Sequence, residues 1–417
     1  MFSYTFTKIN IKPFILLLLI LSQTSLWCQQ SINLTISAGA HDRIDCPVSF
    51  EIPEKLNWKN FNLTEVNKSS SIPIQLSADK SSISFILSGT TLKNTQRHFI
   101  LSNTNNKVNV SSIQLSTING ALQFSKNSSP ILNYQFNIVK PPEGIDEKFQ
   151  KSGFLHPLWS PSGQELTRIQ PPDHYHHYGI WGPWTRTKIG EKPVDFWNLG
   201  EGQGTVLFKD FLSKTEGPVF SSIKVLQEHI DLKSTELNKV ALNEELEIRV
   251  WNLNNKISLV NYSTSFSTPL TSGILFEAYR YGGGIGFRAT EKWNGDNATV
   301  LTSENKNRLN ADGTTAKWVI VEGETNSKEN RSGILFMGYP TNKEFPEPIR
   351  VWPIDANEGK ENVFFEFCPI RHKEWKIAPN KTYKLKYQLL IFDGTLTAEQ
   401  AENYWQNFAN PPKVTIL

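Results

Sequence analysis

The chain has 417 residues, of which 43 are lysine or arginine and 40 are aspartate or glutamate, so its formal net charge is only +3. Long-range attraction to a polyanion needs clustered positive charge, and no block of lysine and arginine occurs here, which argues against nucleic acid as a partner. Phenylalanine (25), tryptophan (12) and tyrosine (11) are plentiful whereas methionine is scarce (2), and this composition favours pleated sheets over helices.

The first thirty residues have the pattern of a secretory signal peptide. Lys8 and Lys12 precede an apolar run at residues 14–21, and polar and small residues follow it. The run is far shorter than the roughly 20 residues that a membrane-spanning helix needs. We therefore predict that residues 1–28 are removed and that the protein is secreted across the inner membrane into the periplasm, with no stable membrane insertion.

Three cysteines occur, and Cys28 lies at the predicted cleavage site. It could carry a lipid anchor, but the bulky Trp27 before it does not suit the small-residue pattern of a lipoprotein cleavage site. Cys46 and Cys368 remain in the mature chain. They could pair, but two cysteines cannot build a disulfide framework, and we expect two separate buried thiols.

Residues 31–130 are predicted to form a small N-terminal β-sandwich. Apolar and polar residues alternate in short runs such as SINLTISA, SSISFILSG and ALQFS, separated by turn residues. Alternation with a period of two predicts half-buried strands. The segment has no cluster of chemically useful side chains, so we expect an accessory domain that the chemistry does not require.

Residues 131–417 are predicted to form a larger β-sandwich domain, because the roughly 390 mature residues exceed what one hydrophobic core usually supports. Runs such as VLFKDFL, SGILFMGYP and YKLKYQLLIF indicate strands. Thr397 can cap one C-terminal helix, in which Ala401, Trp405 and Phe408 recur at helical spacing. The predicted fold class is therefore all-β: a small sandwich followed by a large one with a C-terminal helix.

Four of the eight histidines lie within 22 residues of this larger domain. They are His156, His174, His176 and His177. Prolines before the run DHYHHY and a glycine after it prevent a helix, so the run is extended or looped. In an extended chain the side chains of His174, His176 and Tyr178 would point to one side.

Two chemistries suit such a run. Neutral imidazoles could bind a divalent metal, with Asp173 or a distant carboxylate completing the shell. Alternatively, histidine and tyrosine could transfer protons near neutral pH. The candidate catalytic residues are His174, His176, His177 and Tyr178. The sequence leaves open whether a metal is bound.

Aromatic and cationic side chains flank the histidines. Indole rings can stack on the faces of sugars, and guanidinium groups pair with carboxylate or sulfate, although a tryptophan in a β-sandwich is often a core residue. The expected partner is an anionic oligosaccharide. The candidate substrate-binding residues are Arg168, Arg186, Trp181, Trp184 and Asp173. The glycines of YGGGIGFRA join two strand-like runs with no helix to follow, which indicates a turn or bulge and not a phosphate loop.

The segments HPLWSPSGQELTRIQPPDHYHHYGIWGPWT and VDFWNLGEG resemble a family of secreted bacterial proteins commonly labelled PmoA, after a methane oxygenase subunit. The resemblance covers about residues 132–408. A membrane oxygenase subunit needs several spanning helices, which this sequence lacks, so the label does not describe its function. Members of this family occur among polysaccharide-degrading enzymes. The sequence is also similar to the oligosaccharide dehydratase of marine bacteria that degrade ulvan, a polymer of sulfated rhamnose and glucuronic acid.

That resemblance implies a lyase that eliminates water from the non-reducing terminal glucuronate of ulvan-type oligosaccharides and leaves a 4,5-unsaturated sugar. In glucuronate the C5 hydrogen and the C4 oxygen are gauche, so elimination is syn and one side of the ring must supply both base and acid. His176 with Tyr178 or His174 would meet that need. A cation must face the carboxylate, for which Arg168 is the first candidate and Arg186 the second.

Two other functions fit the same residues. The tryptophans could serve a glycan-binding protein that does no chemistry. Alternatively, a glycoside hydrolase could use paired carboxylates such as Glu277 and Glu366. Product analysis distinguishes the three, because elimination creates a conjugated double bond, hydrolysis creates only reducing ends, and binding creates neither.

Overall fold

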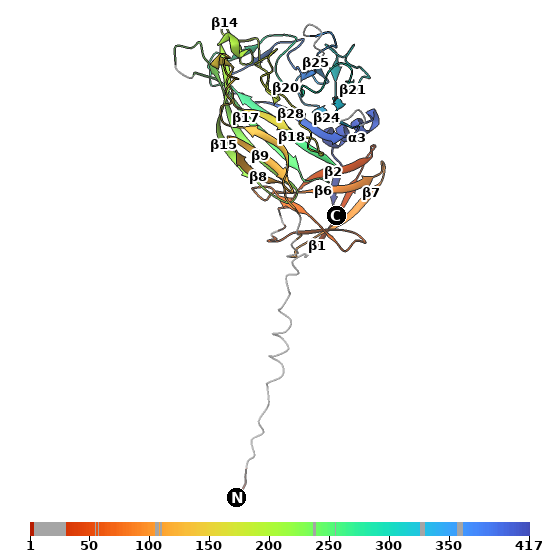
Figure 1. Ribbon diagram of the computed structural model, residues 1–417. Coiled ribbons are helices and arrows are strands. Elements are labelled where there is room, and N and C mark those ends of the chain that lie inside the picture. The colour runs from red at the N-terminus through yellow and green to blue at the C-terminus, as the bar shows by residue number, and fades with distance from the viewer. Residues whose placement is uncertain are drawn as a thin grey trace.

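In the residues that it describes, the structure, a computed structural model, contains two β-sandwiches, a smaller four-stranded sheet and one α-helix with assigned bounds (Figure 1). The predicted signal peptide lies outside the described residues, apart from its first three. No helix in the described part of the chain is long and apolar enough to cross a membrane. The structure describes residues 1–3, 31–54, 56, 58–104, 108, 111–236, 239–254, 256–325, 330–356 and 362–417.

The small sandwich consists of a five-stranded and a three-stranded antiparallel sheet around a core that includes Leu34, Phe85 and Phe99. The first sheet contains, in order, β29 (Lys413–Ile416), β1 (Ser31–Ser37), β7 (Gln96–Ser102), β3 (Asn62–Glu65) and β4 (Ser71–Ile72). The second contains β2 (Arg43–Glu51), β6 (Ser82–Thr91) and β5 (Ile74–Leu76). Because β29 pairs with β1, the C-terminus lies beside the first strand (Figure 1).

The large sandwich packs an eight-stranded sheet against a nine-stranded sheet, and one apolar core lies between them. The eight-stranded sheet runs β15 (Gly204–Thr215), β16 (Phe220–Asp231), β17 (Lys239–Trp251), β18 (Ile257–Ser267), β28 (Tyr383–Asp393), β24 (Arg331–Gly338), β23 (Trp318–Glu324) and β21 (Ala298–Thr302). The nine-stranded sheet runs β22 (Thr315–Ala316), β25 (Glu347–Val351), β26 (Phe364–Phe367), β20 (Ile285–Arg288), β12 (Ile180–Trp181), β11 (Phe154–Leu158), β10 (Ser129–Gln135), β9 (Ala121–Lys126) and β8 (Gln114–Ile118).

A four-stranded sheet and two short 3-10 helices complete the larger unit. The four strands are β14 (Lys192–Val194), β13 (Thr187–Ile189), β19 (Ile274–Phe276) and β27 (Trp375–Ile377), and the 3-10 helices are η1 (Glu147–Phe149) and η2 (Leu199–Glu201). Strands β8 and β9, which the sequence analysis placed in the first domain, pair within the nine-stranded sheet.

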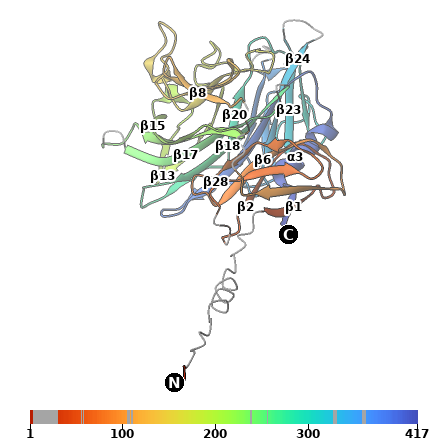
Figure 2. The same ribbon diagram turned by 90° about the horizontal axis from the view of Figure 1, so that it is seen from below.

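The predicted all-β class and the single C-terminal helix are confirmed. Helix α3 (Ala398–Ala409) begins at Thr397, whose side chain accepts a hydrogen bond from the backbone N–H of Gln400, and the Gln400 side chain accepts one from the backbone of Thr397. This capping box satisfies two N–H groups at the helix start. The helix packs Trp405 and Ala401 against the eight-stranded sheet and also contacts β2 of the small sandwich (Figure 2). Cys46 and Cys368 are separate buried thiols, as expected.

Side chains cover the outer face of the nine-stranded sheet, so this face is not exposed to solvent throughout. Along β20 and β26, Phe287 and Phe365 point into the core between the sheets. Because side chains alternate along a strand, Arg288 and Phe364 point the opposite way, and they lie opposite each other in the register. A second aromatic cluster covers this outer face. The sheet therefore has a covered outer surface on which a site can be built.

A protonated carboxyl group is buried inside the large sandwich. Glu347 on β25 is fully buried, and its oxygens accept hydrogen bonds from Asn342 Nδ2 (2.7 Å) and the Tyr387 hydroxyl (2.8 Å). Burial raises the pKa of Glu347 to about 8, although these two hydrogen bonds offset part of the effect. Between about pH 4.5 and pH 8 the folded protein thus keeps a proton that the unfolded chain releases. Stability must fall as the pH rises through this window.

We expect Glu347→Gln to remove this part of the pH dependence, because glutamine keeps the volume but does not titrate. Its amide oxygen can accept from Asn342 Nδ2, and its amide nitrogen can donate to the Tyr387 hydroxyl. Relative to the variant, the wild type should lose at least about 1.4 kcal/mol of unfolding free energy between pH 5 and pH 8, the equivalent of one pKa unit. Urea denaturation at the two pH values measures the difference. Glu216→Gln, at an exposed position, is the control. Identical pH profiles for wild type and Glu347→Gln would contradict the expectation.

Candidate functional site

The histidine-rich run lies over the outer face of the nine-stranded sheet and is built from turns. The N–H of His174 donates to the Pro171 carbonyl (2.8 Å), and that of His177 donates to the His174 carbonyl (3.1 Å). Gly179 then brings the chain against β11, where an added Cβ would meet the Leu155 carbonyl oxygen at 2.3 Å. The alternation of an extended strand therefore does not apply to these side chains.

The turns bring three imidazole rings together. The ring centroids of His174 and His177 are 4.7 Å apart, those of His176 and His177 are 4.8 Å apart, and those of His174 and His176 are 5.3 Å apart. His177 is 1% exposed and is the buried member of the three, whereas the His174 side chain is 25% exposed. We call these three residues the imidazole cluster. His156 lies apart from it, with its Nδ1 2.9 Å from the Thr167 hydroxyl.

Tyr178, a predicted catalytic residue, is not part of the imidazole cluster. Its ring packs on Phe154 at 4.7 Å, and its hydroxyl donates to the Phe149 carbonyl and accepts from Gln170 Nε2 (3.0 Å). Burial raises its pKa, which the hydrogen bond from Gln170 only partly offsets. The turn before Tyr178 points the side chain into the aromatic cluster beneath the loop, so this residue supports the loop and does not face a substrate.

Asp173 links the imidazole cluster to a buried arginine. Its Oδ2 lies 2.9 Å from His174 Nδ1 and accepts a hydrogen bond from Arg288 Nη2 (2.7 Å). Burial alone would raise the pKa of Asp173, but the hydrogen bond with His174 and the charge of Arg288 outweigh burial and hold it well below its usual range. Asp173 is therefore an ionised carboxylate.

The Asp173 carboxylate determines which nitrogen of His174 carries the proton. An ionised carboxylate can only accept, so Nδ1 of neutral His174 must hold its hydrogen toward Asp173, and Nε2 keeps a free lone pair. This is the arrangement in which a carboxylate orients an imidazole for proton abstraction. His174 is thereby equipped as a general base.

The imidazoles of His176 and His177 are neutral at physiological pH. Burial is the main cause that lowers the pKa of His176 to about 3, and the positive charge of Arg288 adds to the effect. Burial, with a contribution from the positive charge of Arg288, lowers the pKa of His177 well below its usual range. Arg288 Nη1 lies 3.4 Å from His177 Nδ1. These rings can exchange hydrogen bonds with a substrate, but they do not remain charged.

Aromatic rings enclose the imidazole cluster. The ring centroid of Trp352 is 4.9 Å from that of His174, and the centroid of Trp197 is 5.6 Å from that of His176. The ring of Trp181, a predicted substrate-binding residue, lies 5.5 Å from that of His177. Trp181 is only 1% exposed, so it packs beneath His177 and cannot contact a substrate. Trp184 does not reach the site, because it is buried in the main core against Phe276 at 4.4 Å.

Tyr281, which the sequence analysis did not single out, lies at the edge of the imidazole cluster. Its phenolic oxygen accepts hydrogen bonds from Arg350 Nη2 (3.0 Å) and Trp352 Nε1 (3.1 Å). With both of these donors directed at its oxygen, the hydroxyl hydrogen of Tyr281 must point toward a third partner. Trp352 thus has His174 against its ring and the Tyr281 hydroxyl at its nitrogen.

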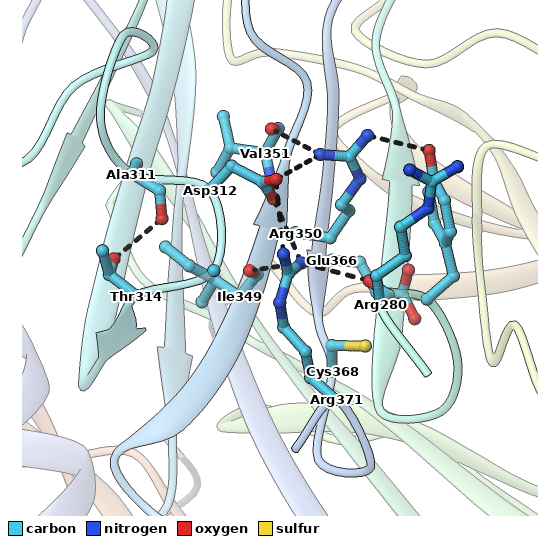
Figure 3. A network of polar contacts seen from close by, with 12 residues as sticks. Arg280, Ala311, Asp312, Thr314, Ile349, Arg350, Val351, Glu366, Cys368 and Arg371 are labelled. Carbon is cyan, nitrogen blue, oxygen red and sulfur yellow. Dashed lines mark hydrogen bonds and ion pairs between the residues drawn. The ribbon is translucent and has the colours of Figure 1, made fainter. Parts of the chain in front are cut away.

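Arginines surround Tyr281. The guanidinium carbon of Arg350 lies 4.8 Å from the centre of its ring, and that of the exposed Arg280 lies 5.3 Å from it. Arg350 and Arg371 converge on Asp312, with contacts of 2.5 and 3.1 Å (Figure 3). Burial works against the charge of Arg350, but Asp312 and Tyr281 raise its pKa above the ordinary value. The edge of the site is therefore firmly cationic.

The two predicted arginines lie on different sides of the site. Arg168 is partly exposed and lies 3.6 Å from Glu291. Burial is the main cause that lowers the pKa of Arg288, and the nearby charge of Arg168 adds to it. Arg186 is exposed and covers the ring of Tyr279 at 4.7 Å. Tyr279 is the ring neighbour of Tyr281. Arg168 thus lies on the side of Arg288 and Asp173, whereas Arg186 lies on the side of Tyr279 and Tyr281.

The carboxylates considered for a hydrolase are not arranged as a pair in solvent. Glu366 is fully buried on β26, its Oε1 accepts from the Gly282 N–H (2.6 Å), and burial raises its pKa well above the usual range. Glu277 forms an ion pair with Lys188 at 2.7 Å. A carboxyl group without access to solvent cannot contact a glycosidic bond, so this pair does not fit hydrolysis.

The residues of the cluster also do not fit a metal site. In the described ranges, no three His, Cys, Asp or Glu side chains are placed so that they could hold one metal ion. Nδ1 of His174 is taken by Asp173, and the Arg288 guanidinium lies where a cation would have to bind. We therefore derive no chemical step through a divalent metal.

Most of the residues that sequence reasoning missed lie in two segments. Tyr281 and Arg288 are the first residue and the arginine of YGGGIGFRA, and Arg350 and Trp352 belong to IRVWP. The alternation of IGFR, with Ile285 and Phe287 apolar, already predicts that Arg288 points away from the core. The glycines do form a turn before β20, with φ of +85° at Gly283 and +58° at Gly284. The sequence thus indicated that the Arg288 side chain points away from the core. It could not indicate that this side chain pairs with Asp173, because Asp173 lies far away in the sequence.

Comparisons with known proteins give a family but no activity. A model of a family described as "Family of unknown function (DUF6807)" matches residues 121–406. No curated protein matches the sequence.

Several solved structures resemble the fold at low identity. A glycosyl hydrolase family 38 protein from Enterococcus faecalis is 8% identical with a TM-score of 0.48, covering 93% of this chain and 48% of that one. Heparan sulfate lyase HepC from Pedobacter heparinus is 9% identical with a TM-score of 0.32, covering 67% of this chain and 36% of that one. A GalM/aldose epimerase homologue from C. elegans is 7% identical with a TM-score of 0.30, covering 69% and 100%. This chain thus spans less than half of the first two proteins, and such scores carry no argument about chemistry.

Proposed function

We propose, from the premise that this chain belongs to the DUF6807 family, that it is a carbohydrate-active lyase. It eliminates water from the non-reducing terminal uronic acid of an anionic oligosaccharide and leaves a 4,5-unsaturated sugar. The observation that carries the proposal is the ionised Asp173 on Nδ1 of His174, which leaves Nε2 available as a base. Trp352 connects this imidazole to the Tyr281 hydroxyl, because its ring contacts His174 and its Nε1 donates to Tyr281. The resemblance to the PmoA-labelled proteins and to the ulvan oligosaccharide dehydratase supports the choice of reaction and of glucuronate.

The chemistry needs a base and an acid on one side of the sugar ring. His174 Nε2 removes the C5 proton, the electrons of the C5–H bond form the C4–C5 double bond, and the C4–O bond breaks. The hydroxyl of Tyr281 gives its proton to the departing oxygen, which leaves as water. Solvent then reprotonates Tyr281 and takes the proton from His174. Proton transfer of this kind contributes typically about 10²- to 10⁴-fold each.

The carboxylate next to C5 must be neutralised before the C5 proton becomes acidic. Arg350 and Arg280 face Tyr281, and the sequence-predicted Arg168 lies on the side of Asp173. Preorganised cations act where negative charge develops in the transition state. We assign the substrate carboxylate to the cationic edge that Arg350 and Arg280 form around Tyr281. We assign Asp173, which the sequence analysis placed among the substrate-binding residues, to orienting His174.

The experiment is a product assay on the mature chain. A panel of oligosaccharides with a terminal uronic acid, ulvan-derived ones among them, is incubated with the protein and followed by near-ultraviolet absorbance and mass spectrometry. Elimination predicts a new absorbance and a product lighter by one water. New reducing ends without absorbance would instead indicate a hydrolase, and binding without any product would indicate a glycan-binding protein. The periplasm as the place of action rests on the predicted signal peptide.

A further inference from the structure

A hollow of about 480 Å³ opens beside the site, between β13, β14 and the loop around η2. Arg186, Lys188, Tyr279 and Asn198 line it. None of the steps proposed above uses these side chains. The hollow is large enough for a sugar residue, and it contains both an aromatic ring and exposed positive charge, the two features that recognise anionic sugars.

An unbroken row of contacts leads from the imidazole cluster to this hollow. The Trp197 ring is 5.6 Å from that of His176 and 5.4 Å from that of Tyr281. The rings of Tyr281 and Tyr279 are 5.9 Å apart, and the Arg186 guanidinium lies 4.7 Å from the ring of Tyr279. Arg280 covers Tyr281 at 5.3 Å. We call Arg186, Tyr279, Arg280 and Tyr281 the arginine–tyrosine strip.

Arg186 is held in an unfavourable backbone conformation. Its φ is +51°, in the left-handed region that residues with a side chain rarely adopt. Its carbonyl nevertheless accepts the N–H of Glu277 (3.0 Å), which fixes the chain next to β19. Such strain persists only where the surrounding structure imposes it, and it concentrates at functional sites. In this backbone conformation the exposed guanidinium group of Arg186 lies over the ring of Tyr279.

The charge of Arg186 is not neutralised by the acidic groups around it. Asp195 accepts hydrogen bonds from its own loop, from the N–H groups of Trp197 and Asn198 and from the Thr185 hydroxyl. Glu277 is paired with Lys188, and Glu201 is exposed to solvent. In the part of the chain that the structure describes, no carboxylate forms an ion pair with Arg186. The guanidinium can therefore receive an external oxyanion.

We propose that the hollow is a second subsite, which binds a carboxylate or sulfate on the sugar residue next to the one that reacts. Tyr279 contacts the face of that sugar, and Arg186 pairs with its oxyanion. The inference rests on the proposed function, since it takes the imidazole cluster as the place where the terminal residue binds. Arg186 is then a specificity determinant that acts on binding and not on proton transfer.

The test measures binding separately from turnover. Uronate-terminated trisaccharides whose second residue carries sulfate, carboxylate or neither are titrated calorimetrically into His174→Ala, with and without Arg186→Gly. Glycine removes the side chain and also tolerates φ of +51°; Arg186→Ala is the second variant. Lys93→Ala, an exposed cation on the small sandwich, is the control for net charge.

We expect loss of Arg186 to weaken binding of the charged trisaccharides at least about tenfold, as for a charged hydrogen bond, and to leave the neutral one within about twofold. Whichever charged substrate responds identifies the oxyanion. In otherwise wild-type protein, KM should rise by the same factor while kcat stays within about twofold. Equal effects on charged and neutral trisaccharides, or none on any, would overturn the subsite. If no substrate is ever dehydrated, the proposed function fails, but the calorimetry still decides whether the hollow selects an oxyanion.

Discussion

Replacing His174 by alanine is expected to lower kcat by about 10³- to 10⁴-fold, the upper part of the range for a proton-transfer group, while KM stays within a few-fold. The imidazole acts mainly in the transition state, because only there does it hold the C5 proton. Asp173→Asn should have a loss of similar size, since an amide can donate to Nδ1 and thereby stabilise the wrong tautomer of His174. Steady-state kinetics on the absorbance of the unsaturated product measures both.

His372→Ala is the matched control, because His372 is exposed and its Nε2 lies 3.3 Å from the Gly313 carbonyl oxygen. His176→Ala, which the sequence alone would rank first, should reduce kcat less than His174→Ala. Among the described residues no carboxylate is hydrogen-bonded to the His176 ring, and burial keeps this ring neutral. If the order of the two variants is reversed, the base is His176. Near-full activity in both variants would rule out elimination by this cluster.

Tyr281→Phe is expected to reduce kcat by about 10²- to 10³-fold, because the departing oxygen then lacks its proton donor. The ring packing against Trp197 and the cation contacts remain, so folding and substrate affinity should change little. Tyr339→Phe, which lies against Phe408 far from the imidazole cluster, provides the matched control. Single-turnover absorbance measures the rate of the chemical step.

A substrate with fluorine in place of the C4 hydroxyl separates the roles of acid and base. Fluoride departs without needing a proton, so the loss in Tyr281→Phe should shrink to a few-fold on this substrate. The loss in His174→Ala should persist, because the C5 proton must still be removed. A Tyr281→Phe defect of equal size on both substrates would mean that Tyr281 positions the sugar and transfers no proton.

The strands and the helix could be predicted because their signals are local. Alternating runs indicate strands, and Thr397 with Gln400 forms a capping box within four residues. The sheet to which a strand belongs is a long-range property. Residues 121–126 alternate like the strands before them, but they pair with β10 in the nine-stranded sheet. Residues 31–126 therefore include strands of the larger sheet, and a truncation that tests whether the first domain is dispensable should keep β8 and β9.

The site was predictable only where its residues cluster in the sequence. The density of histidines located the imidazole cluster, but a run flanked by prolines can be extended or turned, and the turns remove Tyr178 from the cluster. Trp184 illustrates the same limit, because an indole in a sandwich can face solvent or core. Arg288 and Tyr281 come from a different strand region, and only the pairing of β12, β20 and β26 brings them beneath the loop.

The pairing of β29 with β1 affects the order in which the protein can be completed. Residues 413–416 supply the outer neighbour of β1, whose other edge pairs with β7. During synthesis the first sandwich can form early, but the outer edge of β1 then presents free backbone N–H and C=O groups until β29 has been made. Such an open edge is a template for association with another chain. Nascent or C-terminally clipped molecules should therefore be the ones that self-associate through the first sandwich, whereas in the full chain the last strand protects this edge.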